Sequence, residues 1–307
     1  MVVLAALSDV GWVFEAPDDG PFALGVNAPT VDWDGQGQRY VMFFESPLAP
    51  HELAPGCRTG WRIGRATSAD GVTWEIDPEP VIEPEPGTAW ACSASQPAVV
   101  RDGHDWHLLF AMEDDARNVG IGLARGRDGE RFDVVAAPAI EGPRVGMPTV
   151  GLSEGLLHVV YVKAPDLAVA TLDPKTGELL DTDVALVAAD GPDWADHWLV
   201  TPALACVKHG GWGLVYSAFA DPGATLRSYA IAGSDDGWAW SLEEGIAGLD
   251  VTHVDVTLTK DQTLVWYSGA APDGRKAIGL AWTGAPKHKP KARECSVQPG
   301  NAWGTYR

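Results

Sequence analysis

The chain has 307 residues with 22 Lys and Arg against 42 Asp and Glu, so its formal net charge at pH 7 is −20. This balance excludes a protein that binds nucleic acid or anionic membranes, because phosphate groups are bound by basic surfaces. Hydrophobic residues make up 46% of the chain, which excludes a mainly disordered protein, and no apolar run approaches the roughly 18 residues of a membrane-spanning helix.

The start of the chain and its cysteines carry little further information. Residues Val2–Leu7 are apolar, but the segment is short and lacks the basic start of a secretory signal. We therefore expect a cytoplasmic protein, with a secreted mature form as the alternative. The four cysteines are scattered, and we expect buried or inert thiols rather than zinc ligands or a disulfide framework: Cys57, Cys92, Cys206 and Cys295.

Taken in chain order, one unit recurs five times: a short segment with proline near its start, a polar turn and an aromatic-rich strand. The first copy runs through Asn27–Val31, turns at Asp34-Gly35 and continues in Arg39–Phe44. The later copies begin at Ser95-Gln96-Pro97, Gly146-Met147-Pro148, Val200-Thr201-Pro202 and Thr252-His253-Val254, where valine replaces proline. The copies follow one another at intervals of about 50 to 70 residues.

Each unit continues into a third strand and a turn, and the last unit has no fourth strand after it, so the N-terminal segment Gly11–Glu15 supplies the missing one. Four strands in about 50 residues are typical of a propeller blade, and closing the ring in this way removes exposed sheet edges. We therefore predict an all-β five-bladed β-propeller with four antiparallel strands per blade; an open β-sandwich is the alternative. The chain is then a single domain, 1–307, with blades at about 25–80, 92–137, 144–187, 198–245 and 250–284 plus 10–16, and a C-terminal tail at 285–307.

These motifs resemble those of the five-bladed propeller glycosidases, namely glycoside hydrolase family 43 and its relatives among invertases and levanases. The resemblance covers most of the chain. It rests on the proline at the start of the inner strand, the aromatic second strand and the turn Ala66–Trp74, which reads Ala-Thr-Ser-Ala-Asp-Gly-Val-Thr-Trp. The resemblance implies a glycosidase with three catalytic acids at the starts of inner strands, because one carboxylate must activate or stabilise while another donates a proton.

The three acids of the family are not preserved. The position of the base, before Pro29, holds Ala28; that of the modulating Asp holds Met147; and that of the acid Glu holds Val200. Three interpretations stay open. The first, which we favour, is a glycosidase-like enzyme that acts on a carbohydrate or glycoside by carboxylate and histidine acid–base chemistry with relocated acids. The others are a non-catalytic carbohydrate- or ligand-binding propeller and a non-hydrolytic enzyme of the cyclase or isomerase type.

The ligand site is expected on the face that carries the loops before the first strand and after the second strand of each blade. Acid–base candidates on this face are Asp196, His197, Glu113 and Glu45. Candidates for substrate binding are Trp194, Trp198 and Trp90, whose rings can stack on a sugar, with Gln96, Asp114 and Arg144 as polar partners. Glu45 and Glu113 end strands that we expect to be equivalent, so they are predicted to share one rim. The alternative for the segment 194–198 is an exposed loop whose tryptophans cover a blade edge.

His253 occupies the place of a family histidine that faces the central channel and helps to hold a metal ion or water. By period-2 alternation Asp255 should point the same way, and Asp32 should point into the same channel. We therefore expect a channel site of His253, Asp255 and Asp32 for calcium, another metal ion or water; the alternative is a hydrogen-bonded structural histidine. No cofactor is expected to be required, and the expected partner is a small-molecule or carbohydrate ligand rather than nucleic acid or a membrane. The oligomeric state is not determined by these patterns.

Overall fold

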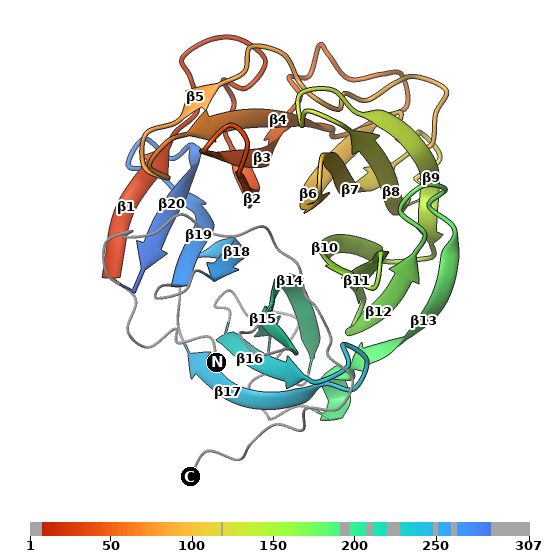
Figure 1. Ribbon diagram of the computed structural model, residues 1–307. Helices are drawn as coiled ribbons and strands as arrows, with labels where there is room; N and C mark the ends of the chain where they lie inside the picture. The colour runs from red at the N-terminus through yellow and green to blue at the C-terminus, as the bar shows by residue number, and fades with distance from the viewer. Residues whose placement is uncertain are drawn as a thin grey trace.

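A computed structural model describes residues 8–117, 119–190, 197–206, 211–219, 228–247, 251–258 and 263–283. Within these ranges every regular element is a β-strand except one 3-10 turn, η1 (Ala188–Asp190), and nothing helical there has the length and hydropathy of a membrane span. The strands form five four-stranded antiparallel sheets arranged as a ring around a central axis (Figure 1). The predicted five-bladed β-propeller is confirmed.

The first strand of each blade is the innermost one, and the blades are numbered I to V in chain order (Figure 1). Blade I consists of β2 (Asn27–Asp34), β3 (Arg39–Pro47), β4 (Trp61–Ser68) and β5 (Glu75–Ile76). Blade II consists of β6 (Ser93–Asp102), β7 (Asp105–Glu113), β8 (Val119–Gly126) and β9 (Asp133–Glu141). Blade III consists of β10 (Val145–Ser153), β11 (Leu156–Lys163), β12 (Asp166–Leu172) and β13 (Leu179–Leu186). Blade IV consists of β14 (Trp198–Cys206), β15 (Trp212–Phe219), β16 (Ser228–Ser234) and β17 (Ser241–Ala247).

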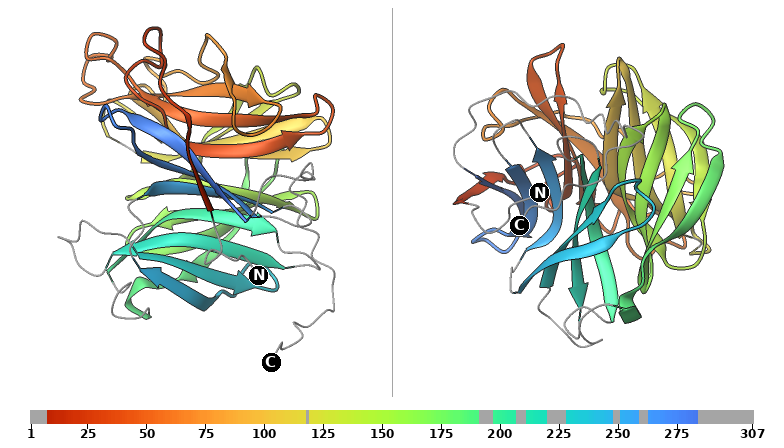
Figure 2. Two further views of the ribbon diagram at one scale, coloured as in Figure 1. Left: turned by 90° about the vertical axis from the view of Figure 1, so that its left-hand side faces the viewer. Right: turned by 60° about the horizontal axis from the view of Figure 1, so that its bottom comes forward.

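Blade V closes the ring with strands from both ends of the described chain. Its inner three strands are β18 (Thr252–Leu258), β19 (Thr263–Ala270) and β20 (Lys276–Trp282). The outer strand is β1 (Ser8–Phe14), which runs antiparallel to β20 with Ser8 opposite Trp282 and Phe14 opposite Ile278 (Figures 1 and 2). The N-terminal strand therefore completes the last blade, as its sequence predicts.

The hydrophobic core is divided among the five junctions between neighbouring blades. Each junction holds one cluster of buried apolar side chains drawn from the two blades that face each other. Trp212 in the junction of blades III and IV and Trp266 in that of blades V and I are completely buried. Aromatic side chains of the second strands thus fill the wedge between blades.

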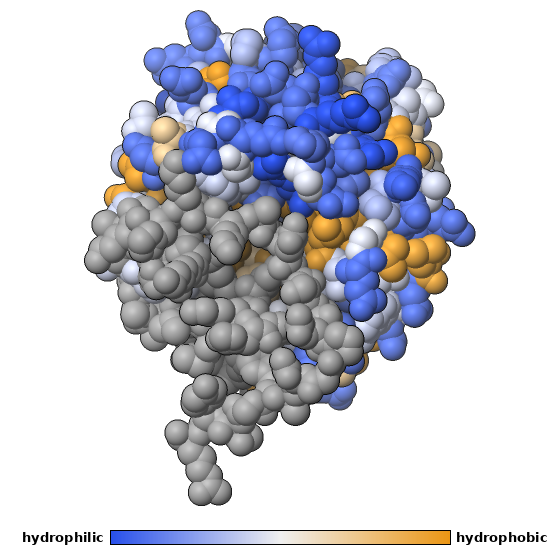
Figure 3. Space-filling model, viewed as in Figure 1, coloured by the Kyte–Doolittle hydropathy of each residue, from blue (hydrophilic) through white to orange (hydrophobic). Residues whose placement is uncertain are grey.

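The outer surface differs between blades. Hydrophilic residues cover blades I and II in the view along the axis, whereas apolar surface appears beside blade III (Figure 3). Exposed apolar side chains on the outer strands β9 and β13 include Val135, Leu180 and Val184. On β13, the carboxylates of Asp181 and Asp183 each accept the backbone amide of the next residue, at 2.8 and 2.7 Å. These bonds satisfy amides of an outermost strand within the strand itself, which makes it a poorer template for pairing with another chain.

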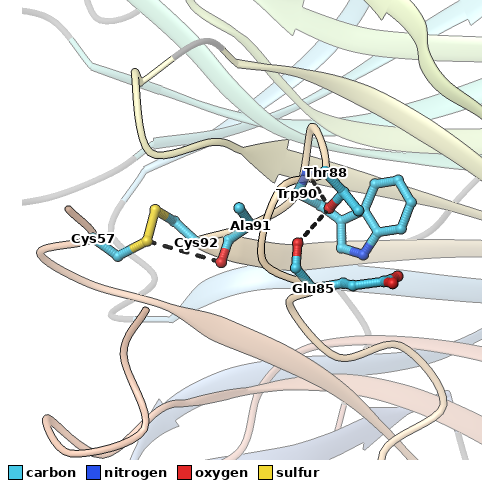
Figure 4. Close-up of a disulfide and its surroundings, with 6 residues drawn as sticks. All are labelled: Cys57, Glu85, Thr88, Trp90, Ala91 and Cys92. Carbon is cyan, nitrogen blue, oxygen red and sulfur yellow. Dashed lines mark hydrogen bonds between the residues drawn. A yellow bond between two sulfur atoms is a disulfide. The ribbon is translucent and has the colours of Figure 1, made fainter. Parts of the chain in front are cut away.

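Two cysteines differ from the expectation of inert thiols. Cys57, in the loop between β3 and β4, forms a disulfide with Cys92, which immediately precedes β6 (Figure 4). Beside it, the buried Arg62 side chain contacts Glu52 at 2.5 Å and Glu83 at 3.4 Å. The disulfide and these ion pairs join the long loop of blade I to the segment that leads into blade II.

Candidate functional site

The inner strands share one unusual backbone conformation. Each has a single residue with positive φ at the same position, directly before proline in blades I to IV and before Val254 in blade V: Ala28 (47°), Gln96 (50°), Met147 (48°), Thr201 (48°) and His253 (43°). At each of them the pairing with the second strand shifts register, as in a β-bulge. The left-handed region is costly for residues other than glycine, so the surrounding contacts must hold these five residues in place.

These five bulge residues, here called the hub ring, line one pocket on the axis together with the residue that follows each of them. The cavity has a volume of about 30 Å³, which is enough for about two water molecules. A molecule of the size of a sugar ring does not fit inside this cavity. The hub ring offers an amide, a thioether, a hydroxyl and an imidazole, and none of its five side chains is a carboxylate.

Side chains of the preceding blade hold the backbone amides of the hub ring. The amide of Gln96 donates to Glu45 Oε2 at 2.8 Å, and the amide of Ala28 donates to Ser268 Oγ at 2.8 Å. Glu45 and Ser268 occupy the same position of their second strands, opposite the residue that precedes the bulge. In blades I and V, a polar residue at this position therefore holds the bulge amide of the next blade.

Blades II and III lack such a residue, because the equivalent positions are Ala111 and Val162. There the bulge side chain of the preceding blade provides the acceptor instead. The amide of Met147 donates to Gln96 Oε1 at 2.9 Å, and the amide of Thr201 approaches Met147 Sδ at 3.4 Å. These contacts consequently join neighbouring blades in sequence around the ring, from blade V to blade I and then through blades II and III to blade IV.

Glu45 belongs to this linkage and does not lie on the rim. Its side chain is 3% exposed, and its second oxygen accepts the Asn27 side-chain amide at 2.6 Å. Burial raises the pKa of the Glu45 carboxyl, against the lowering effects of the Gln96 amide, the Asn27 amide and the charge on Lys276. A carboxylate occupied on both oxygens and covered by protein is not placed to act on a substrate.

The predicted equivalence of Glu45 and Glu113 is wrong. Glu45 lies opposite Asn27, next to the bulge, whereas Glu113 lies opposite Ser93, two residues farther from the bulge of its own blade. The position in blade II that is equivalent to Glu45 is Ala111. The two glutamates therefore occupy different layers of the propeller and do not form a pair on one rim.

The layer of Glu113 does contain other predicted site residues. In blade III, the residue equivalent to Glu113 is Ala164, and Arg144 lies opposite it just before the inner strand, with its carbonyl accepting the Ala164 amide at 3.2 Å. In blade IV, the equivalent residue is Phe219, and Trp198 lies opposite it on the inner strand. Glu113 is half-buried, Arg144 is exposed and the Trp198 side chain is 41% exposed. These three residues therefore belong to the same rung of strand pairing on three consecutive blades, with Glu113 on the second strand and Arg144 and Trp198 on the inner-strand side, and we call them the rim layer.

The other candidates lie around this layer. His197 directly precedes β14, is half-buried, and has its ring 6.0 Å from that of Trp198. Asp114 is half-buried and follows Glu113 at the end of β7. Trp90 is half-buried and packs edge-on against Phe110, with ring centroids 6.3 Å apart, so most of it contributes to the core beside the disulfide (Figure 4). Asp196 and Trp194 lie outside the described residues.

The predicted channel site of His253, Asp255 and Asp32 is not assembled. Among the residues that the structure describes, no three His, Cys, Asp or Glu side chains form a group that could hold a metal ion. Asp255 is buried and accepts the Val31 amide of blade I at 2.8 Å, and Asp32 is buried and accepts the Trp33 amide at 2.7 Å. The bulge at His253 interrupts the period-2 alternation on which the prediction was based, so only His253 of the three lines the pocket.

Asp255 instead has the role that threonine has in other blades. Thr30 accepts the Val99 amide at 3.2 Å, and Thr149 accepts the Leu204 amide at 2.9 Å. Like Asp255, each of these residues lies two positions after the bulge residue of its inner strand and accepts the equivalent amide of the next blade. Asp255 is therefore a structural acceptor between blades V and I.

Comparison with known proteins adds information on the fold. No protein-family model matches the chain, and no curated protein matches it in sequence. The fold is that of several glycoside hydrolases. A β-1,2-mannobiose phosphorylase from Listeria innocua, solved with β-1,2-mannobiose, superposes with a TM-score of 0.66 at 11% identity, over 92% of each chain. An endo-arabinase from Bacteroides thetaiotaomicron superposes with a TM-score of 0.67 at 14% identity, over 87% of this chain and 97% of that one.

A thermostable family-43 glycoside hydrolase is similar to the same degree, with a TM-score of 0.65 at 18% identity over 91% of this chain and 97% of that one. The resemblance that the sequence shows to family 43 is thus confirmed for the fold. The hub ring could also have been found from the sequence, because its members share the position before proline in four of the five units. The disulfide partners have no such common pattern.

Proposed function

We propose that the protein is a glycosidase-like enzyme that acts on a carbohydrate or glycoside held over the hub ring, with acid–base groups supplied by the rim. The observation that carries this proposal is the rim layer, in which Glu113, Arg144 and Trp198 lie on three consecutive blades beside a hub ring without carboxylates. The fold shared with an endo-arabinase, a family-43 glycoside hydrolase and a phosphorylase solved with a disaccharide supports a carbohydrate as the ligand class.

Each rim residue suits one requirement of glycoside cleavage. The leaving oxygen needs a proton donor, and the opposite side of the sugar needs a second group to activate water or stabilise charge. Glu113 on blade II and His197 at the start of blade IV can approach a ligand over the hub from two sides, with Asp196 as a further acid from the same segment as His197. Trp198 offers an exposed ring for stacking on a sugar, while Arg144, Asp114 and Gln96 can bind hydroxyl groups.

Hydrolysis assays test this proposal. The wild-type chain would be assayed against a panel of 4-nitrophenyl furanosides and pyranosides, and the best substrate carried forward to the variants. We expect Glu113→Gln and Asp196→Asn each to lower kcat by about 100-fold or more, the usual contribution of a general acid or base. Glu141→Gln, which alters an exposed glutamate at the end of β9 in the same blade as Glu113, serves as the control and should leave kcat unchanged. Turnover that survives both acid substitutions would refute the proposed roles.

A specific observation favours a second candidate, a non-catalytic carbohydrate-binding propeller. The positions that the family uses for catalytic acids contain no carboxylate in this chain, although two of them, Ala28 and Met147, line the hub pocket. Isothermal titration with the same glycosides distinguishes the two functions. Saturable binding that is weakened by Trp198→Ala, without release of product, would establish binding alone.

A further inference from the structure

Glu45 differs from its counterparts in the other blades. At the equivalent position of the second strand, blade V has Ser268 and blade IV has Ser217, and both are uncharged. Ser268 shows that a hydroxyl is sufficient to hold a bulge amide, since it accepts the Ala28 amide at the same 2.8 Å. A carboxylate in blade I therefore adds a charge and a second acceptor that this function does not require.

The contacts of Glu45 extend into the pocket. Glu45 accepts the Gln96 amide, and the side chain of Gln96 in turn accepts the Met147 amide. Both Gln96 and Met147 line the pocket and both have positive φ, at 50° and 48°. Because this backbone conformation is intrinsically unfavourable, it depends on the bonds that hold it.

The strength of these bonds depends on the charge of Glu45. As a carboxylate, Glu45 accepts on both oxygens, and its partners Asn27 Nδ2 and the Gln96 amide are both donors. A protonated carboxyl has one hydroxyl, which is a poor acceptor, and its remaining carbonyl accepts more weakly than a charged oxygen. Asn27 can turn its amide to accept from the hydroxyl, whereas the Gln96 backbone amide has no such freedom.

The charged surroundings of Glu45 are simple. On β2 and β6 it meets the uncharged Asn27 and Gln96, and on β4 it lies opposite Ile63. Lys276 at the start of β20 is the charged side chain that acts on it, and it favours the ionised form. Burial acts in the other direction and places the Glu45 pKa above the ordinary value of 4.5.

We propose that Glu45 is a positioning residue for the hub pocket: its ionised carboxylate holds the Gln96 bulge and, through Gln96, the Met147 bulge, so the pocket floor rearranges when Glu45 is protonated. A ligand bound over the hub, as in the proposed function, would then have different affinities on the two sides of this pH step. The positioning role itself does not depend on which ligand binds.

Methyl NMR tests the inference without a ligand. The chain has four methionines, so the full-length protein labelled with ¹³C at the methionine methyl groups gives few signals, and Met147→Leu assigns that of Met147. We expect the Met147 signal to move in one step as the pH is raised above 4.5. In Glu45→Gln, an uncharged analogue of the protonated side chain, the signal should stay at the wild-type acid position and lack this step. His253 in the same pocket can add a separate step, which would persist in Glu45→Gln.

Two further variants keep the test decisive if Glu45→Gln folds poorly. Lys276→Met removes an exposed charge, so the step should move to higher pH because the ionised Glu45 loses a favourable partner. Ser268→Ala removes the equivalent acceptor of blade V without removing a titrating group, and it should retain the step at the wild-type pH. The inference is overturned if the wild type shows no such step, if Glu45→Gln retains it, or if Lys276→Met leaves its midpoint unchanged. None of these outcomes bears on the glycosidase proposal, and absence of sugar binding or hydrolysis would not affect the inference about Glu45.

Discussion

Replacing both Cys57 and Cys92 by serine should destabilise the propeller by an amount that follows from the length of the loop that the disulfide closes. The two residues are 35 positions apart. The chain-entropy relation assigns a loop of this length a loss of about 13 cal/mol/K in the unfolded state, or about 4 kcal/mol at 25 °C. Native contacts such as Arg62 with Glu52 and Glu83 also hold the two loops together, so the folded geometry should persist in the variant.

Urea unfolding followed by tryptophan fluorescence measures this effect. With an m-value of about 3 kcal/mol/M, a loss of 4 kcal/mol lowers the midpoint by roughly 1 M. Reductant should lower the midpoint of the oxidised wild type to a similar degree and have no effect on the double serine variant. Equal midpoints for the oxidised wild type and the variant, or reaction of Cys57 and Cys92 with a thiol reagent before reduction, would show that the disulfide does not stabilise the protein as argued.

Three further predictions concern the inner strands and the blade junctions. Asp255→Ala removes the carboxylate that accepts the buried Val31 amide and should cost about 1–3 kcal/mol of unfolding free energy. Asp255→Thr should recover most of this loss, because threonine has the same role in two other blades. Equal losses for the two variants in denaturant unfolding would contradict this role. Burial lowers the pKa of His158, so the unfolded chain binds a proton more readily than the folded one. The stability of the wild type should therefore fall as the pH drops below 6.5 and through the folded-state pKa. In thermal unfolding, the stability of His158→Phe should decline less steeply between about pH 7 and 5. Ala28→Gly should be neutral or stabilising, because φ is 47° at this residue and glycine adopts such values without strain. Ala66→Gly in the regular strand β4 should cost about 0.5–1 kcal/mol. A larger loss for Ala28→Gly than for Ala66→Gly in the same unfolding assay would mean that the packing of the Ala28 methyl group contributes more to stability than relief of its backbone conformation.

Local sequence patterns were sufficient to predict the architecture. The proline position, the polar turns and the aromatic second strands are local patterns, and each predicts a strand or turn from residues close together in the chain. Repetition of the unit and the absent fourth strand of the last copy then determine a closed ring completed by β1. The position before proline also marks the hub ring, since four of its five members precede a proline.

Which side chains meet depends on how the blades pack against one another. The bonds from Gln96 to Glu45 and from Ala28 to Ser268 join residues 51 and 240 positions apart, and no local pattern encodes such pairings. The bulges insert a left-handed residue into each inner strand, so counting by alternation fails beyond them and wrongly directed Asp255 to the channel. The disulfide depends in the same way on how the loops of blades I and II meet. Local periodicity specifies the blades, whereas the site depends on the register and contacts between them.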